Sequence, residues 1–157
     1  MSRNLTALLT FLVICLGVEF VSGFATRQSV STWYVTLNKP SWTPPGWIFP
    51  IMWTLLYVAM GVAAWLVWQK GPAPAVTTGL VLFGVQLVLN GLWSFVFFNG
   101  RNIGLAFVDI ALLWVALGAT VWWFWSVRPA AGALLVPYFV WVSFAMALNY
   151  AILKLND

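Results

Sequence analysis

The sequence predicts an all-α membrane protein, a bundle of five transmembrane helices with a structured first loop. Hydrophobic residues make up 63% of the 157 residues and charged residues only 6%, whereas about a quarter of the residues in soluble proteins are charged. The apolar residues form five runs, each long enough to cross about 30 Å of hydrocarbon at about 1.5 Å per residue. We therefore expect a single transmembrane domain, residues 1–157, with helices at about 5–25, 45–69, 77–98, 103–125 and 130–153.

The first two runs have recognisable beginnings and ends. The run at 5–25 carries Glu19 near its end, and a carboxylate there argues against a cleaved secretion signal, so we interpret the run as a membrane helix. The second run starts at Pro44 and Pro45, because proline suits a helix entrance, where the first N–H groups have no intrahelical partner. It ends at residues 70–74, a helix-breaking Lys-Gly-Pro-Ala-Pro linker.

The other three runs are joined by short connections. The Asn-Gly-Arg-Asn sequence at 99–102 predicts a tight turn, and Pro129 ends the fourth run. Only the first connection, residues 26–44, is about 20 residues long, and a loop of that length in a compact protein is more often functional than idle. An odd number of helices puts the termini on opposite sides of the membrane, but the basic residues are divided too evenly to orient the protein.

The rare residue types exclude several functions. The chain has no histidine and one cysteine, Cys15, which lies in an apolar run and is typical of a small buried hydrophobe. We therefore expect no metal site and no required cofactor. The net charge is +4, but the basic residues are scattered singly. Binding to nucleic acid needs a basic patch, so we expect no nucleic-acid partner.

Polar residues within the apolar runs gather at one depth. Five residues, one from each helix, lie about 6 to 12 Å inside the boundary beneath the first loop. They are Glu19, Trp53, Asn90, Asp109 and Asn149. Ionisable groups inside a membrane usually face the bundle interior or a wet cavity, so we expect a pocket with the first loop as its lid. For any one of these residues, a simple hydrogen bond between helices is the alternative.

The tryptophans divide into two groups. Trp141 lies near the midplane, where an indole N–H needs a partner, and together with Trp53 it offers flat walls to a planar hydrophobic ligand; core packing is the alternative for each. Five others reach the boundary opposite the first loop and predict an aromatic belt. They are Trp65, Trp68, Trp122, Trp123 and Trp125.

The last helix carries two further patterns. Small residues recur every four positions, at Ser143, Ala147 and Ala151, which permits close helix contact within the bundle or between subunits. Three residues also fit a loose cholesterol pattern that many helix ends match by chance. They are Leu148, Tyr150 and Lys154.

The run at 33–57, WYVTLNKPSWTPPGWIFPIMWTLLY, resembles the first loop and second helix of the TspO/MBR family, the tryptophan-rich sensory or translocator proteins. The resemblance continues in order over nearly the whole chain. Its further matches are Asn90-x-x-Trp93, Phe97-Phe98, Asp109, Pro137-Tyr138-x-x-Trp141, Ala145 and Leu148-Asn149.

The resemblance implies a membrane receptor for a planar tetrapyrrole such as protoporphyrin IX, with sterol or lipid as a further ligand and a homodimer as the assembly. A sensory or regulatory role in the tetrapyrrole or stress response goes with it. Because the chain has no histidine to ligate haem iron, we expect porphyrin as a ligand and not as a haem cofactor. The family's ligand-contacting positions correspond to Tyr34, Pro44, Phe49, Trp53, Asn90, Trp93, Tyr138, Trp141 and Ala145.

Two other functions remain open. The first is a light- and oxygen-dependent enzyme that degrades porphyrin, with Trp53 and Trp141 as redox participants; nothing else in the sequence marks catalysis. The second is a transporter, which the absence of inverted repeats disfavours. The short chain and its early hydrophobic span favour a bacterial cell membrane, inner or outer.

Overall fold

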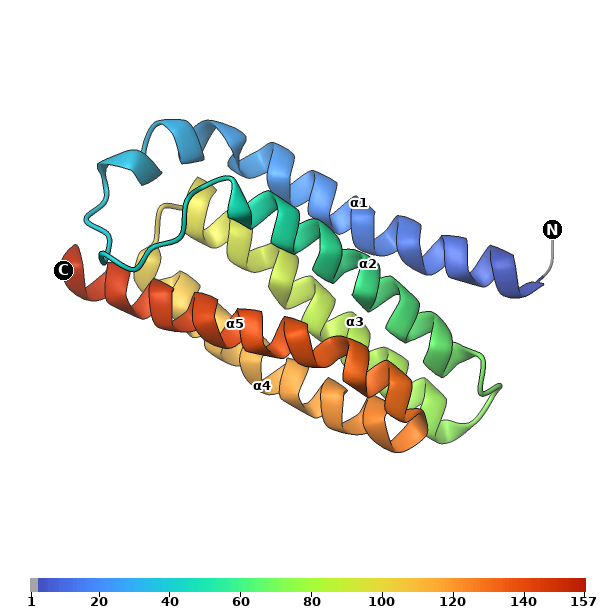
Figure 1. Ribbon diagram of the computed structural model, residues 1–157. Coiled ribbons are helices and arrows are strands. Elements are labelled where there is room, and N and C mark those ends of the chain that lie inside the picture. The colour runs from blue at the N-terminus through green and yellow to red at the C-terminus, as the bar shows by residue number, and fades with distance from the viewer. Residues whose placement is uncertain (1–2) are drawn as a thin grey trace.

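The computed structural model describes residues 3–157, which form a bundle of five helices (Figure 1). The helices are α1 Arg3–Ser31, α2 Ile48–Trp68, α3 Pro74–Ser94, α4 Ile103–Val127 and α5 Pro129–Leu155. Each is long and apolar enough to cross a membrane, which confirms the predicted fold class. The start of α1 and the end of α5 lie at opposite ends of the bundle, as expected for an odd number of helices.

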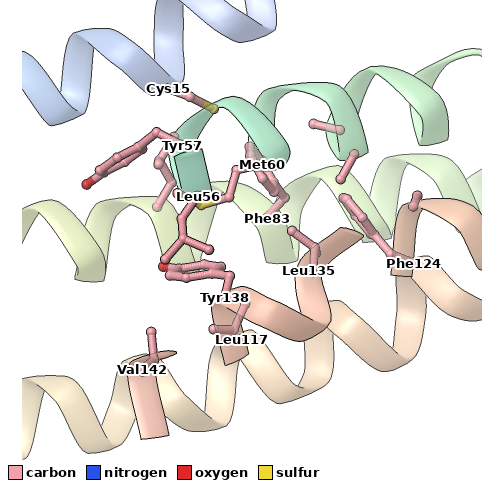
Figure 2. Close-up of a cluster of buried hydrophobic side chains, with 14 of the residues drawn as sticks. Cys15, Leu56, Tyr57, Met60, Phe83, Leu117, Phe124, Leu135, Tyr138 and Val142 are labelled. Carbon is pink, nitrogen blue, oxygen red and sulfur yellow. The ribbon is translucent and has the colours of Figure 1, made fainter. Parts of the chain in front are cut away.

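The helices close into a ring around one core. The α4 helix packs between α3 and α5, and α2 packs between α1 and α5. Figure 2 shows apolar side chains from all five helices meeting in the middle, among them Cys15, Met60, Phe83, Leu117 and Leu135. The ring order therefore leaves α1 and α5 apart, with α2 between them.

The first helix is longer than predicted. It continues through residues 26–31, which we predicted to belong to the first loop and which include Thr26, Arg27 and Ser29. Thr26 and Ser29 are buried. This polar end of the helix therefore packs against the bundle and stays helical. The connection is correspondingly shorter, and a 3₁₀ helix, η1 Tyr34–Thr36, lies within it.

A π-helical turn, η2 Phe95–Asn99, follows α3. Its wider ring is closed by the Gly100 N–H, which donates to the Phe95 carbonyl oxygen at 2.8 Å. A Cβ at Gly100 would lie 2.8 Å from the Val96 carbonyl oxygen, so only glycine fits there. Turns of this kind are frequent at functional sites, and this one lies beneath the first loop.

The end of the bundle away from the first loop is closely packed. A Cβ at Gly132 would lie 2.7 Å from the Cα of Trp125, so α4 and α5 nearly touch. Trp123 fills the space over Gly79 and donates its N–H to the Ala75 carbonyl at 2.7 Å. Trp122 is 77% exposed, as expected for a belt residue facing lipid.

Candidate functional site

A cavity of about 400 Å³ lies beneath the first loop. Side chains from α1, α2, α3, η2, α5 and the loop line it, and none of the lining residues in the described part of the chain comes from α4. Its volume falls within the range of roughly 300 to 1,000 Å³ typical of small-molecule sites. We take this cavity as the candidate functional site.

Most of the predicted ligand-contacting residues surround this cavity. Those that line it are Tyr34, Phe49, Trp53, Asn90, Trp93, Trp141 and Ala145. Tyr138 does not: it is fully buried behind Trp53, with the two ring centroids 6.3 Å apart. Pro44 is also outside the lining, because α2 begins at Ile48, later than predicted, and Gly46 takes its place at the edge of the cavity.

The intramembrane polar residues behave differently from one another. Glu19 and Asn149 line the cavity, as predicted. Asp109 does not, so its predicted place in the pocket is wrong: it is 6% exposed on α4, which lies behind α3 and α5. A hydrogen bond between helices was the alternative for each of these residues, but the Asp109 Oδ2 atom has no partner within residues 3–157. The sequence gives the depth of a residue on its helix but not the direction in which it points.

Aromatic rings form the walls of the cavity. Trp53 and Trp141 contact each other with centroids 6.4 Å apart and planes at 86°, so they form a corner and do not face each other across the space. Phe49 meets Trp141 edge to face at 5.8 Å. On the other wall, Trp93 stacks on Phe97 at 5.1 Å. These rings present both faces and edges to anything bound between them.

A buried hydrogen-bonded chain forms the floor. The Tyr57 hydroxyl donates to Asn90 Oδ1 at 2.6 Å, and the Asn90 amide donates to the Tyr138 hydroxyl. Tyr138 in turn donates to Gln86 Oε1 at 2.9 Å, and Gln86 Nε2 reaches the Met60 sulfur at 3.7 Å. Asn90 thus belongs both to the lining and to the core. Gln86 and Met60, at the far end of this hydrogen-bonded chain, were not predicted; the signal that could have found Gln86 is its polar side chain within an apolar run.

Two polar lining residues are held by neighbouring helices. The Trp93 N–H donates to Asn149 Oδ1 at 3.0 Å, and the Asn149 amide donates to the Ile103 carbonyl oxygen at 3.1 Å. Asn149 therefore fixes the indole of Trp93 and ties the cavity wall to the start of α4. On the other side, Glu19 accepts a hydrogen bond from the Thr54 hydroxyl.

Two buried polar atoms of the lining have no hydrogen-bond partner within residues 3–157. They are Ser22 Oγ and Trp141 Nε1. Burying a polar group without a partner costs free energy. The sequence placed Trp141 at a depth where its N–H needs a partner, whereas Ser22 was not among the predicted site residues.

The cavity reaches the surface between α1 and α2. The exposed members of its lining are Gly23, Arg27 and Val30 on α1, together with Gly46 and Pro50 at the start of α2. Arg27 forms no ion pair among residues 3–157. The mouth therefore carries one positive charge on an otherwise apolar rim.

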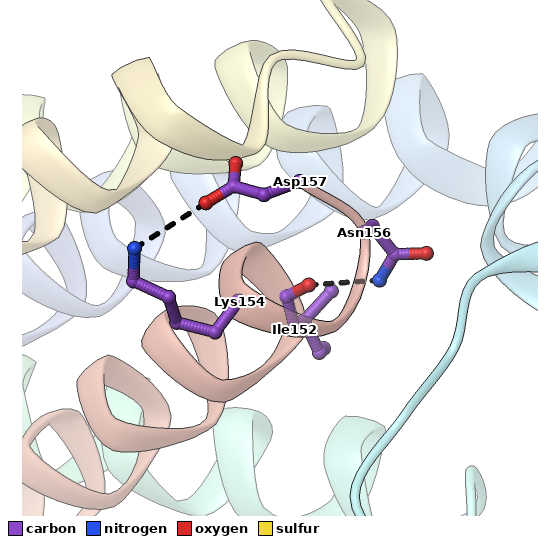
Figure 3. A network of polar contacts seen from close by, with 4 residues as sticks. All are labelled: Ile152, Lys154, Asn156 and Asp157. Carbon is purple, nitrogen blue, oxygen red and sulfur yellow. Dashed lines mark hydrogen bonds and ion pairs between the residues drawn. The ribbon is translucent and has the colours of Figure 1, made fainter.

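The first loop lies over the cavity and is fastened to the last helix. The side chain of Asn156 accepts from the Asn38 N–H at 3.0 Å and donates to the Asn38 carbonyl oxygen at 2.9 Å. Asn156 Nδ2 also donates to the Ile152 carbonyl oxygen, which holds it on α5 (Figure 3). Sequence reasoning missed this latch, because two asparagines 118 positions apart carry no local pattern.

Within the loop, η1 sits on the π turn. The Tyr34 ring lies 6.2 Å from Phe97 and 5.7 Å from Phe98. The Lys39 ammonium donates to the Tyr34 carbonyl oxygen at 2.8 Å and lies 4.7 Å from the centre of the same residue's ring. Burial raises the pKa of the Tyr34 phenol above its usual value, so the phenol keeps its proton further into the alkaline range than a free tyrosine does.

The residues of the cholesterol pattern do not share a surface. Leu148 points into the cavity, whereas Tyr150 is exposed and packs against Phe107. Lys154 pairs with Asp157 at 3.4 Å (Figure 3). The small-residue stripe is likewise divided, since Ser143 accepts the Trp114 N–H at 2.8 Å. The predicted homodimer stays a prediction.

A second hollow, of about 510 Å³, lies on the outside of α4 and α5 at the opposite end. Its lining includes the belt residues Trp122 and Trp125 together with Phe139. It holds none of the buried polar atoms that lack a partner. Such an apolar groove on the outer face of membrane helices suits lipid chains. We therefore prefer the cavity beneath the first loop as the candidate functional site.

Comparison with known proteins agrees with this architecture. The TspO/MBR family model matches residues 11–155. The chain is 42% identical to the tryptophan-rich protein TspO of Chlorobaculum tepidum, over 99% of each chain. It is 37% identical to the tryptophan-rich sensory protein of Cereibacter sphaeroides, over 99% of this chain and 95% of the relative. It is also 39% identical to the human translocator protein, over 89% of this chain and 81% of the relative.

Proposed function

The chain belongs to the TspO/MBR family, and from that premise we propose that it is a membrane receptor for a planar hydrophobic ligand. The ligand is a porphyrin such as protoporphyrin IX, and a sterol is a second ligand of the same cavity. Its role is sensory or regulatory, in the tetrapyrrole or stress response. The five apolar helices and the family make the chain an integral, multi-pass membrane protein.

The aromatic walls of the cavity carry this proposal. Phe49, Trp53, Trp93 and Trp141 all line one space, and offset or edge contacts with a flat ligand contribute about 0.5 to 1.5 kcal/mol each beyond area burial. Protoporphyrin IX also bears two carboxylates, and Arg27 at the mouth supplies a positive charge for them. A flat apolar body therefore matches the lining in shape, and an acidic edge placed at the mouth, away from the Glu19 carboxylate, matches the charge of Arg27.

A titration of the purified protein with protoporphyrin IX tests the proposal. We expect a saturable shift of the Soret band for the native protein and a loss of affinity of about fivefold to tenfold for Phe49→Ala, which removes one aromatic wall. Phe107→Ala is the matched control, because Phe107 is equally half-buried but lies outside the cavity against Tyr150. If the native protein shows no saturable shift, or if both variants lose affinity equally, the proposal fails.

Light- and oxygen-dependent porphyrin degradation is the second candidate. The contact between Trp53 and Trp141 favours it, because both indoles lie at the cavity and would adjoin a bound porphyrin. Illumination in air should then bleach bound protoporphyrin faster than free protoporphyrin, and Trp53→Phe or Trp141→Phe should slow the bleaching. Equal bleaching rates for bound and free protoporphyrin would show that the protein does not catalyse its degradation.

We propose a bacterial cell membrane as the location of the protein, on its likeness to the relatives from Chlorobaculum tepidum and Cereibacter sphaeroides. Separation of inner and outer membranes from a bacterial cell that produces the protein, followed by immunodetection, would decide between the two membranes.

A further inference from the structure

Three basic residues that are far apart in the sequence gather around the end of α2. Arg3 lies against Trp68, with its guanidinium carbon 5.5 Å from the centre of the ring. Lys70 lies just beyond the end of α2, and Arg128, between α4 and α5, donates to the Leu66 carbonyl oxygen at 3.3 Å. The start of α1, the end of α2 and the turn between α4 and α5 lie at one end of the bundle (Figure 1). We call Arg3, Lys70 and Arg128 the basic cluster.

No acidic residue balances the basic cluster. The chain has three, Glu19, Asp109 and Asp157, and all lie in the half of the bundle beneath the first loop. None of the three residues of the basic cluster forms an ion pair among residues 3–157. The loop end differs, because Lys154 pairs there with Asp157 and Lys39 donates to two backbone carbonyls. Most of the net charge of +4 is therefore at the end away from the first loop.

Tryptophans place the basic cluster at the boundary of the membrane. Trp65 and Trp68 belong to the predicted aromatic belt, and tryptophan side chains concentrate at the level of the lipid headgroups. The Trp65 N–H donates to the Asn4 carbonyl oxygen at 3.1 Å, which ties the start of α1, next to Arg3, to the end of α2. Lipid phosphates lie at the same level, so basic side chains there attract anionic headgroups.

Arg128 is held in place with part of its guanidinium group free. Its Nη1 atom donates to the Leu66 carbonyl oxygen and to Gln69 Oε1 at 2.8 Å. The Nε and Nη2 atoms form no hydrogen bond among residues 3–157, and they are not among the buried atoms that lack a partner, so both are accessible at the surface. Capping the carbonyls at the end of α2 needs only Nη1. The free Nε–Nη2 edge presents two parallel N–H groups, the geometry that binds two oxygens of a phosphate.

We propose that the basic cluster binds the headgroup of an anionic phospholipid. The Nε–Nη2 edge of Arg128 holds the phosphate, and the exposed Lys70 and Arg3 draw negative charge to the same end of α2. A lipid with a net negative charge fits better than a zwitterionic one, because no acidic residue at this end receives the positive group of a zwitterionic headgroup. The basic cluster and the cavity lie at opposite ends of the bundle, so the inference does not depend on the ligand of the cavity.

Lipid binding in mixed micelles tests the inference. The purified protein is titrated with phosphatidylglycerol and, separately, with phosphatidylcholine of the same acyl chains, and bound lipids are counted by native mass spectrometry. We expect the native protein to prefer phosphatidylglycerol. Lys70→Gln and Arg128→Gln should each lower this preference about fivefold, the factor that one basic residue near the surface contributes. Arg128→Lys keeps the charge but loses the two parallel N–H groups, so it should lower the preference about threefold.

The chain offers a matched control at the other boundary. Arg101 is exposed and forms no ion pair among residues 3–157, as is true of Lys70, but it lies at the loop end. Arg101→Gln should change the preference by less than about twofold, because the two ends are separated by more than a Debye length. Arg128→Gln also removes the bonds to Leu66 and Gln69, so its melting temperature is measured as well. Lys70→Gln breaks no hydrogen bond between residues 3–157 and tests the basic cluster without a loss of stability.

Three results would overturn the inference. The first is equal binding of phosphatidylglycerol and phosphatidylcholine by the native protein. The second is an equal loss of preference in Arg101→Gln and Lys70→Gln, because the preference would then follow the net charge of the protein. The third is displacement of phosphatidylglycerol by glycerol phosphate at equal concentration, because the basic cluster would then bind a soluble phosphate. A native preference in Arg128→Lys would remove the assigned role of the Nε–Nη2 edge.

Discussion

The two ends of the bundle are made from the same apolar helices but are packed in opposite ways. At the end away from the first loop, glycines bring helices together: Gly79 lies under Trp123, Gly132 touches Trp125, and a Cβ at Gly61 would lie 3.0 Å from the Leu12 side chain. At the loop end, rings such as Trp53 and Phe97 line a cavity. Small residues at helix contacts let membrane helices pack closely. Large aromatic side chains hold the helices further apart and leave a cavity between them.

The boundary between the ends lies at the Tyr57–Asn90–Tyr138 chain. Just beside it, a Cβ at Gly91 would lie 3.2 Å from Val18 Cγ1, which is a close approach of α1 to α3. Beyond this point, towards the loop, the α1 residues from Glu19 onward line the cavity. We therefore expect stability to be concentrated on one side of this boundary and ligand recognition on the other.

The largest expected effect is in the closely packed end. Gly132→Ala places a methyl group 2.7 Å from the Trp125 backbone, which cannot turn away as a side chain can. We expect a loss of about 3 kcal/mol in the free energy of unfolding, at the upper end for overpacking, measured by reversible unfolding in mixed micelles. Gly84→Ala is the control, because nothing lies within 4 Å of its added Cβ. Equal losses for the two variants would contradict the packing difference.

A smaller loss is expected at the boundary. Asn90→Ala leaves the hydroxyls of Tyr57 and Tyr138 without Asn90 as a partner, and we expect a loss of about 1 to 2 kcal/mol, since hydrogen bonds within membranes are worth roughly 0.6 to 1.7 kcal/mol each. Ser94→Ala, one turn further along the same cavity wall, should change stability by less than about 0.5 kcal/mol. If the two substitutions lower the melting temperature equally, the hydrogen bonds of Asn90 to Tyr57 and Tyr138 do not stabilise the folded protein.

At the loop end, kinetics should change more than stability. Asn156→Ala removes both hydrogen bonds to the Asn38 backbone, worth about 1 kcal/mol together after exchange with water. We expect release of bound porphyrin to become about fivefold faster in stopped-flow measurements, with little change in the melting temperature of the ligand-free protein. Asp157→Asn, which breaks only an exposed ion pair with Lys154, should leave release unchanged. An unchanged release rate in Asn156→Ala would show that the loop is not a lid.

The smallest effect is expected in the aromatic belt. Trp125 is 49% exposed near the far boundary, so Trp125→Phe should leave porphyrin affinity unchanged and alter stability by less than about 0.5 kcal/mol. Equilibrium titration beside thermal melting measures both. A tenfold loss of affinity would mean that the far end takes part in binding and would abolish the distinction between the two ends.

The sequence alone predicted the helices and much of the cavity, because both depend on position along the chain. Apolar length determines which segments can cross a membrane, and the depth of Glu19, Asn90 and Asn149 within those segments brought them to one level. Asp109 was misplaced for the complementary reason. Depth does not determine which way a side chain points around the helix axis, and α4 turned out to lie behind the cavity.

Features that depend on distant contacts could not be predicted. Residues 26–31 are polar enough to be loop, and they stay helical because Thr26 and Ser29 pack against other elements. The π turn at 95–99 is a local change of backbone hydrogen bonding that no residue pattern marked. The Asn38–Asn156 latch brings together residues 118 positions apart. Unpaired atoms such as Ser22 Oγ are recognisable only when every neighbour is known.

The position of the mouth between α1 and α2 has a consequence for how binding must be measured. Gly23 and Pro50 at that mouth belong to helices that can cross a membrane, and the hydrophobic ligand that we propose would partition into the lipid around them. Its relevant concentration is then the number of ligand molecules per lipid, which its partition coefficient determines. A dissociation constant expressed per volume of water will therefore rise with the amount of lipid or detergent in the sample, whereas the same constant expressed as a mole fraction in the bilayer will stay fixed.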